Sequence, residues 1–352
     1  RWGDSPKDEN GHFLWLDDSS NSDEWISYDF PGRPKNPQKY NTVWIRAILP
    51  ESDMNFDSLR FRSPQQISQV FIDGDLVYSF GTFNTDKKVR IPGTGWHFVD
   101  LPPDYGGKAV YFRLQSPLPE YAGFLHSIYV GNYSDHFLDI IFSNLSNVVF
   151  SSFFILFGVA IAIIGILGSE KFKCILYIGL ISLSFGGWSI SEASHLLQLL
   201  YNIGISSVYA ANFFIFIVPI WFLLYMKQAY SIEPRWHRFL YRLLLTLHIL
   251  IPIAAFSLDL LGIISCIYFN HPFHIITALS AVFYFYTVIR NLKNDIRGTI
   301  LFLSGFLVLL ITGIIDTFQL FYKRTSMLTV TQFSYPGMFY FLLTLLIAVA
   351  RE

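Results

Sequence analysis

The sequence predicts an N-terminal all-β sandwich of the jelly-roll type followed by an all-α bundle of seven transmembrane helices. The charges divide the chain near residue 140. Residues 1–140 contain 13 Lys and Arg and 19 Asp and Glu, whereas residues 141–352 contain 12 and 7. Period-two alternation is found before that point and long uncharged segments after it. We therefore expect two domains, residues 1–138 and residues 139–352.

The first domain has the pattern of short, half-buried strands joined by turns. Apolar and polar residues alternate in segments 25–30, 43–48, 110–115 and 124–130. The pair Asp73-Gly74 separates two apolar segments and predicts a hairpin, because glycine tolerates the positive φ of a tight turn. Eight or more strands of this kind, punctuated by Pro and Gly, indicate a jelly roll.

The second domain consists of apolar segments long enough for membrane helices. A helix needs about 20 mostly apolar residues to cross the hydrocarbon core. The segments between residue 140 and residue 350 lack charge over long stretches, and Lys and Arg lie in the gaps between them. The predicted helices are 144–167, 174–196, 208–228, 239–258, 265–289, 298–321 and 328–350.

The loop charges predict the orientation of these helices. With the N-terminal domain outside, the inner segments contain 10 Lys and Arg and the outer loops 2, Lys323 and Arg324. The C-terminus is then cytoplasmic. Both cysteines, Cys174 and Cys266, lie in predicted helices, so disulfides do not brace the exported domain. We expect the bacterial inner membrane, and an export signal removed before Arg1.

Several strand segments resemble a known family. They are Trp-Ile-Ser-Tyr (25–28), Trp-Ile-Arg (44–46), Val-Phe-Ile-Asp-Gly (70–74), Tyr-Phe-Arg-Leu (111–114) and Ile-Tyr-Val-Gly (128–131). Their order is similar to a galactose-binding-like jelly roll. Such a domain before seven helices resembles the bacterial seven-transmembrane receptors with diverse intracellular signalling modules. The resemblance implies a cytoplasmic cyclase, kinase or phosphatase effector after the last helix, which this chain does not contain.

A polar ligand, a carbohydrate above all, would need aromatic platforms and forked hydrogen-bond donors. The residues that offer these in the periplasmic domain are Trp96, Arg46, Arg113, Tyr121 and Trp44. Trp96 follows Pro92-Gly93-Thr94-Gly95, which predicts an exposed loop edge. The alternative for each residue is an ordinary role in packing, since sandwich cores contain tryptophan.

Polar residues within the predicted helices form a second set of candidates. Asp316, Glu192, His271 and His274 are the main ones, and Asp259 lies at a helix end. Buried ionisable groups in a membrane are costly and often functional. These candidate residues would line a polar pocket. The alternative is that they contact headgroup water and neighbouring helices. Two histidines do not complete a metal site, so we expect no metal.

We expect a signalling receptor, or its sensor half, and not an enzyme. No phosphate loop, catalytic triad or cofactor motif is recognisable, so no cofactor is expected. The expected partners are a small polar ligand, a glycan or a periplasmic protein, the lipid bilayer, a cytoplasmic effector domain and a second copy of the chain, but not nucleic acid. The alternatives are a transporter or channel subunit with a β-sandwich lid, and an envelope protein that binds glycan without signalling.

Overall fold

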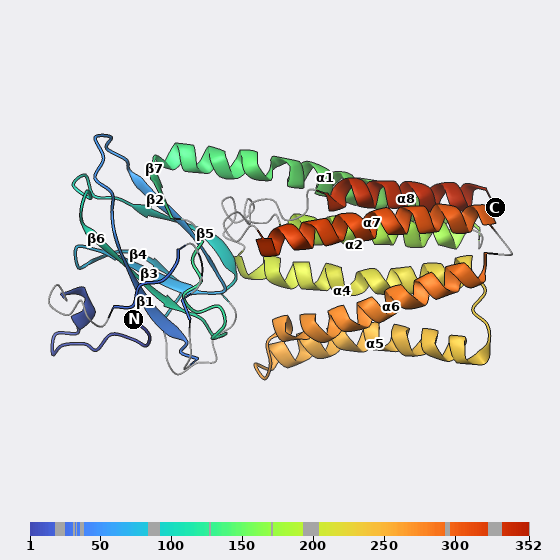
Figure 1. The fold of residues 1–352 in the computed structure, drawn as a ribbon, viewed down its shortest axis with the longest axis horizontal. Helices are drawn as coiled ribbons and strands as arrows, with labels where there is room; N and C mark the ends of the chain where they lie inside the picture. Colours follow the sequence, from blue (N-terminus) through green and yellow to red (C-terminus); the bar gives the residue numbers. More distant parts are fainter. Residues whose placement is uncertain are drawn as a thin grey trace. The chain divides into compact units, whose positions relative to one another are not determined.

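The computed structural model describes residues 1–17, 25–30, 32, 34–35, 39–83, 92–126, 128–169, 172–192, 204–292, 296–322 and 333–351 (Figure 1). The described residues form two compact units. The β unit is Arg1–Ser143. The helical unit contains the helices from Asn144 onward.

In the described part of the β unit, seven strands form two antiparallel sheets. One sheet has the order β1-β6-β3-β4, and the other has the order β5-β2-β7. The strands are β1 Thr42–Ile48, β2 Ser58–Pro64, β3 Ile67–Ile72, β4 Asp75–Phe80, β5 Thr94–Asp100, β6 Ala109–Gln115 and β7 Tyr129–Gly131. A short 3-10 helix, η1, spans Leu14–Leu16.

One hydrophobic core holds the two sheets together. Val43 and Phe112 of the four-stranded sheet and Leu59, Phe61 and Val99 of the three-stranded sheet belong to it, and all are almost completely buried. The predicted alternation in β1 and β6 is confirmed, because alternate residues of both strands face this core. The expected two-sheet β domain is therefore present, whereas a jelly roll has eight strands and the described residues form seven.

The predicted hairpin is confirmed, and two other predicted strands are wrong or too long. Asp73 and Gly74 connect β3 to β4 with φ values of 54° and 89°. Residues 25–30 form no strand, because Trp25 and Tyr28 pack their rings on the sheets without pairing their backbone. In the predicted segment 124–130, strand pairing with β2 covers Tyr129 and Val130, and the backbone nitrogen of His126 makes one further hydrogen bond, to the backbone oxygen of Arg62 in β2. Residue 127 lies outside the described residues.

The helical unit agrees with the predicted series of apolar segments. Within the described residues, six helices are long and apolar enough to cross a membrane, and a seventh apolar helix, α8, has 17 residues. In Figure 1, α7 and α8 lie side by side, and the two helices are in extensive contact. The helices are α1 Tyr133–Leu167, α2 Lys173–Glu192, α4 Gly204–Ala229, α5 Arg235–Leu260, α6 Asn270–Arg290, α7 Ile296–Tyr322 and α8 Ser334–Ala350, with the 3-10 helix η4 Cys266–Phe269 before α6.

Helix α1 begins 11 residues before the predicted start at residue 144, at Tyr133. The additional turns belong to the β unit. Asp57 accepts a hydrogen bond from the backbone nitrogen of Tyr133 at 2.8 Å, which satisfies a free donor of the first helical turn. The β unit therefore supplies the helix start, and a hydropathy pattern does not detect it.

Candidate functional site

Three of the five predicted ligand residues lie on one face of the four-stranded sheet. Trp44 and Arg46 are on β1, and Arg113 is on the neighbouring strand β6. Trp44 is directly opposite Arg113 in the register, and Arg46 is opposite Tyr111. Their side chains alternate with the core-facing residues, so they occupy the sheet face directed away from the core.

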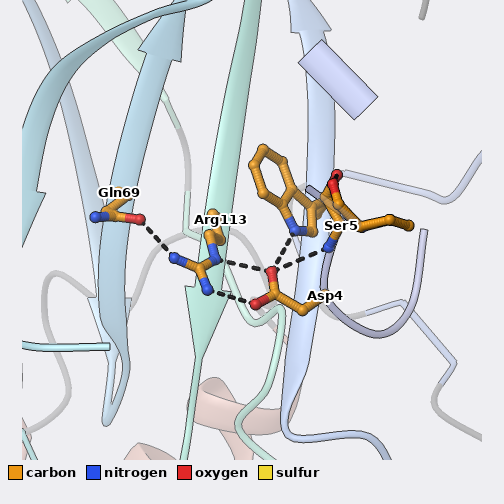
Figure 2. Close-up of polar contacts among 6 residues, drawn as sticks. Asp4, Ser5, Gln69 and Arg113 are labelled. Atoms are coloured by element: carbon orange, nitrogen blue, oxygen red, sulfur yellow. Dashed lines mark hydrogen bonds and ion pairs between the residues drawn. The ribbon is translucent and has the colours of Figure 1, made fainter. Parts of the chain in front are cut away.

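A carboxylate from the N-terminal segment lies at the centre of this face. Arg113 donates to Asp4 through Nε (2.9 Å to Oδ1) and through Nη2, and it donates through Nη1 to Gln69 at 2.8 Å. Trp44 Nε1 and the backbone nitrogen of Ser5 both donate to Asp4 Oδ1 at 3.0 Å. Figure 2 shows the contacts of Arg113, Ser5 and the indole converging on the carboxylate of Asp4, and Gln69 on the other side of Arg113.

Aromatic rings enclose the guanidinium group of Arg113. The ring centroids of Phe13 and Phe83 lie 4.7 and 4.1 Å from its Cζ atom. Such cation–π contacts strengthen when water is excluded, and Arg113 is buried. The guanidinium group is therefore held in position by two rings, a carboxylate and the amide of Gln69.

The N-terminal segment is fixed to the sheet along its length. Arg1 and Trp44 exchange two backbone hydrogen bonds of 2.9 Å, which extends the sheet at the β1 edge. Phe13 and Trp15 then pack on the apolar cluster of Trp44, Phe71 and Tyr111. The segment thus covers the face on which we expected a ligand.

This arrangement can recognise a carboxylate or a similar planar group of acceptors. Arg113 and the indole of Trp44 present three side-chain N–H donors to the two oxygens of Asp4. The donors are preorganised because they project from paired strands. In the structure, Asp4 satisfies them within the same chain.

We expect Asp4→Ala to lower the free energy of unfolding of the β unit by about 2–3 kcal/mol. Removing one member of a buried ion pair costs roughly 3–5 kcal/mol, but solvent screens this pair because the Asp4 side chain is 39% exposed. Glu9→Ala, in the same segment but exposed, is the control. Hydrogen exchange of the β1 and β6 amides in the full chain measures the difference, and equal protection in both variants would contradict the assigned contacts.

Trp96 is buried in a strand, so the expected exposed loop edge is wrong. It lies within β5 of the three-stranded sheet and is 7% exposed. Its ring packs on the guanidinium group of Arg60 at 5.0 Å. Only Pro92 and Gly93 precede β5, whereas Thr94 and Gly95 are already part of the strand and pair with Pro64 and Ser63 of β2, so the glycine-rich sequence does not expose Trp96.

Tyr121, the fifth predicted ligand residue, lies outside the cluster around Arg113 and Asp4. Tyr121 lies in the turn after β6, is partly buried, and its backbone nitrogen donates to Leu118. Arg46 is the exposed member of the predicted set, with its Cζ atom 5.8 Å from the centroid of the Tyr111 ring.

A second polar cluster lies inside the sandwich. His97 Nε2 is 2.7 Å from Ser63 Oγ, and its Nδ1 is 2.9 Å from the Tyr78 hydroxyl. Ser63 Oγ is also 3.2 Å from Ser68 Oγ, so the cluster connects both sheets. A paired serine and histidine is an arrangement used in nucleophilic catalysis. Here, however, His97 and Ser63 are fully buried, so a substrate cannot reach them.

Burial lowers the pKa of His97 to about 3, so the imidazole is neutral at neutral pH. Burial and the nearby charge of Arg62 likewise lower the pKa of His126 to about 3. In the unfolded chain both groups have the ordinary value near 6.5. The unfolded state therefore binds more protons than the folded state as the pH falls below that value.

We expect the β unit to lose stability between pH 7 and pH 5. The contribution of each neutral histidine is complete above about pH 6.5 and decreases as the pH falls toward 3. Linkage gives a loss of about 2 kcal/mol per group by pH 5. The measurement is hydrogen exchange of the full chain, corrected for intrinsic rates, at pH 7 and pH 5. His97→Gln should reduce the dependence by about half, and constant protection in the wild type would contradict the neutral assignment.

Among the predicted intramembrane residues, Asp316 has a structural role. Its Oδ2 accepts hydrogen bonds from the backbone nitrogen and hydroxyl of Ser334, at 2.7 and 2.5 Å, and its Oδ1 accepts one from the backbone nitrogen of Phe333 at 3.2 Å. These donors lie at the first turn of α8, where free N–H groups favour a carboxylate. Asp316 of α7 thus caps the neighbouring helix.

The other predicted polar residues have different surroundings from Asp316. Asp259 accepts hydrogen bonds from the Tyr209 hydroxyl and from the backbone nitrogen of Cys266. Glu192 is exposed at the end of α2, and His271 and His274 are exposed in the first turns of α6. In the described part of the chain, no group of three or more His, Cys, Asp or Glu side chains could hold a metal ion.

Asp4 and Gln69, which both accept hydrogen bonds from Arg113, are not among the predicted ligand residues. Gln69 is detectable in principle, because it is opposite Arg113 in the strand register on the same outward face. Asp4 gives no such signal, since it lies in a segment without regular secondary structure, 109 positions from Arg113.

Comparison of the chain with protein-family models, with curated proteins and with solved structures finds no match, so these comparisons show neither a family nor an enzyme class.

Proposed function

We propose that the chain is the sensor half of a bacterial seven-transmembrane receptor, with a jelly-roll ectodomain that binds a polar ligand in the periplasm. The observation that carries the proposal is the group of Trp44, Arg113 and Gln69 on one sheet face, with forked donors directed at a single carboxylate. A carbohydrate with a carboxylate or paired hydroxyls offers the same acceptors. Such a ligand replaces Asp4 in this proposal, and the exposed Arg46 lies on the adjoining part of the face.

Contacts between the β unit and the start of α1 support a relay. Arg60 of β2 donates to the backbone oxygen of His136 at 3.0 Å and to Asp139 at 2.8 Å. The rings of Trp96 and Tyr129 pack on its guanidinium group, at 5.0 and 4.8 Å from Cζ. A shift of β2 therefore changes contacts made directly by the first turns of α1.

Signalling requires that the ligand bind one of two conformations more tightly. In the proposal, the state with Asp4 on Arg113 is the unliganded one, and ligand binding releases the N-terminal segment from the sheet. The helices transmit the resulting change to a cytoplasmic effector. A ligand that bound both states equally would bind without signalling, as in an envelope glycan-binding protein.

The test is binding of the full chain, in lipid nanodiscs, to an array of neutral and acidic glycans. We expect Arg46→Gln to weaken binding by about fivefold, the equivalent of roughly 1 kcal/mol for a contact at the edge of the site. Asp4→Asn should strengthen binding of acidic glycans, because it weakens the competing contact. Lys35→Gln, an exposed cation elsewhere in the β unit, is the control. If the folded wild type binds no glycan, a carbohydrate-sensing receptor is excluded.

A further inference from the structure

We propose that Arg235, Arg238 and Arg242 of α5 form a binding site for the phosphodiester headgroup of an anionic phospholipid. The three residues lie at i, i+3 and i+7 in the first two turns of the helix, which places them on one face. All three are exposed. This site is independent of the sheet face proposed to bind the polar ligand.

The three guanidinium groups lack carboxylate partners within the described residues. None of the ion pairs there involves them, and the nearest acidic residue in sequence, Glu233, is also exposed. In contrast, Arg60 and Arg113 of the β unit each pair with an aspartate. Three unpaired cations beside the positive end of a helix dipole favour a phosphate group.

The same helix face continues as an apolar surface suited to acyl chains. Exposed residues on it include Phe239, Leu243, Ile253 and Leu260, and its segment from residue 243 to residue 258 has no charge. At about 1.5 Å per residue, the helix from Arg242 to Leu260 is about 27 Å long, close to the thickness of a hydrocarbon core. The arginines thus lie at headgroup level when this face contacts acyl chains.

Contacts with α6 orient the arginine face away from the helix pair. His237 Nε2 is 2.9 Å from Thr287 Oγ1, and His237 is fully buried against α6. Trp236 packs its ring on Tyr286 with centroids 5.4 Å apart. Since His237 lies on the opposite side of α5 from Arg235 and Arg242, these contacts leave the arginines accessible from the lipid.

The chemistry selects a lipid with a net negative charge. Arginine can form two parallel hydrogen bonds with a phosphate, and each basic group near an anionic membrane surface contributes about 1 kcal/mol. A zwitterionic lipid carries the same phosphate, but its ammonium group repels the cluster. We therefore expect phosphatidylglycerol to bind in preference to phosphatidylcholine.

Native mass spectrometry of the purified full chain, titrated with phosphatidylglycerol or phosphatidylcholine, tests the site. The triple variant Arg235→Gln, Arg238→Gln, Arg242→Gln should weaken phosphatidylglycerol binding by on the order of 100-fold. The single variant Arg238→Gln should weaken it by about fivefold, which keeps the test valid if the triple variant does not fold. The matched control, Lys227→Gln, Arg290→Gln, Arg297→Gln, removes the same charge from the ends of α4, α6 and α7.

Three results would overturn the proposal. They are equal loss of binding in the control and the triple variant, unchanged binding in the triple variant, and equal affinity for the two lipids. Glycerol phosphate, which lacks acyl chains, is the second probe. If it displaces phosphatidylglycerol at equal concentration, the site binds free phosphate and not a lipid.

Discussion

We expect His97→Ala to lower the free energy of unfolding of the β unit by about 4 kcal/mol. Large-to-small substitutions of fully buried side chains cost roughly 2–5 kcal/mol, through lost contacts and the cavity left behind. His97 is fully buried, and Phe61 stacks on its imidazole with ring centroids 4.7 Å apart. The substitution also removes one hydrogen-bond partner each from Ser63, which is buried, and Tyr78, which is partly buried.

Hydrogen exchange of the β2 and β5 amides in the full chain measures this loss. His12→Ala is the control, because the His12 side chain is 77% exposed and lies outside the core. His97→Gln should be less damaging than His97→Ala, since the amide fills part of the space and restores one hydrogen bond. A loss below about 1 kcal/mol for His97→Ala, typical of a surface position, would contradict a connection between the sheets through this residue.

We expect Gly179→Leu to destabilise the helical unit by at least about 3 kcal/mol, at the upper end of the cost of overpacking. A Cβ atom at Gly179 of α2 would meet the backbone nitrogen of Ala162 and, at 2.8 Å, the backbone oxygen of Gly158, both in α1. A Cβ at Gly158 would in turn lie 2.5 Å from the backbone nitrogen of Leu183. Because these neighbours are backbone atoms, the two helices must separate to admit a side chain.

Close approach through small residues is a known basis of helix association in membranes. Separation would also break the hydrogen bond from Ser182 to the backbone oxygen of Phe154, 2.9 Å, and the bond between Ser151 and Ser189, 2.7 Å. Thermal unfolding of the full chain in detergent measures the effect. Gly313→Leu in α7 is the matched control, since a Cβ there would meet no atom within 4 Å. Similar losses in both variants would contradict the α1–α2 packing.

The structure could be predicted from the sequence where a local pattern determines it. Positive φ at Asp73 and Gly74 is a local requirement, and the hairpin follows from it. The alternation in β1 and β6 reports one buried face, so the core positions could be read directly. The apolar helices were also predictable, because a hydrocarbon environment demands long uncharged segments.

The structure could not be predicted from local sequence patterns where residues distant in the chain determine it. Segment 25–30 alternates like a strand but packs only its rings on the sheets, and nothing local reveals that its backbone is unpaired. The start of α1 depends on Asp57 and Arg60. Arg113 alternates with the core-facing Phe112 and Leu114, so its face follows from the local pattern, but its partner Asp4 is remote in sequence. His97 is two residues before Val99 in β5, and this spacing could have predicted that both side chains face the core.

The proposed receptor requires that the β unit and the basic ends of α5 and α6 be on opposite sides of one membrane. The test is labelling of single cysteines at positions 46 and 238 with an impermeant maleimide, in intact bacterial spheroplasts. Both positions are exposed, and the native Cys174 and Cys266 are buried and can be replaced by serine. We expect a cysteine at position 46 to react in intact cells and one at position 238 to react only after lysis. Labelling of position 238 in intact spheroplasts would contradict the account.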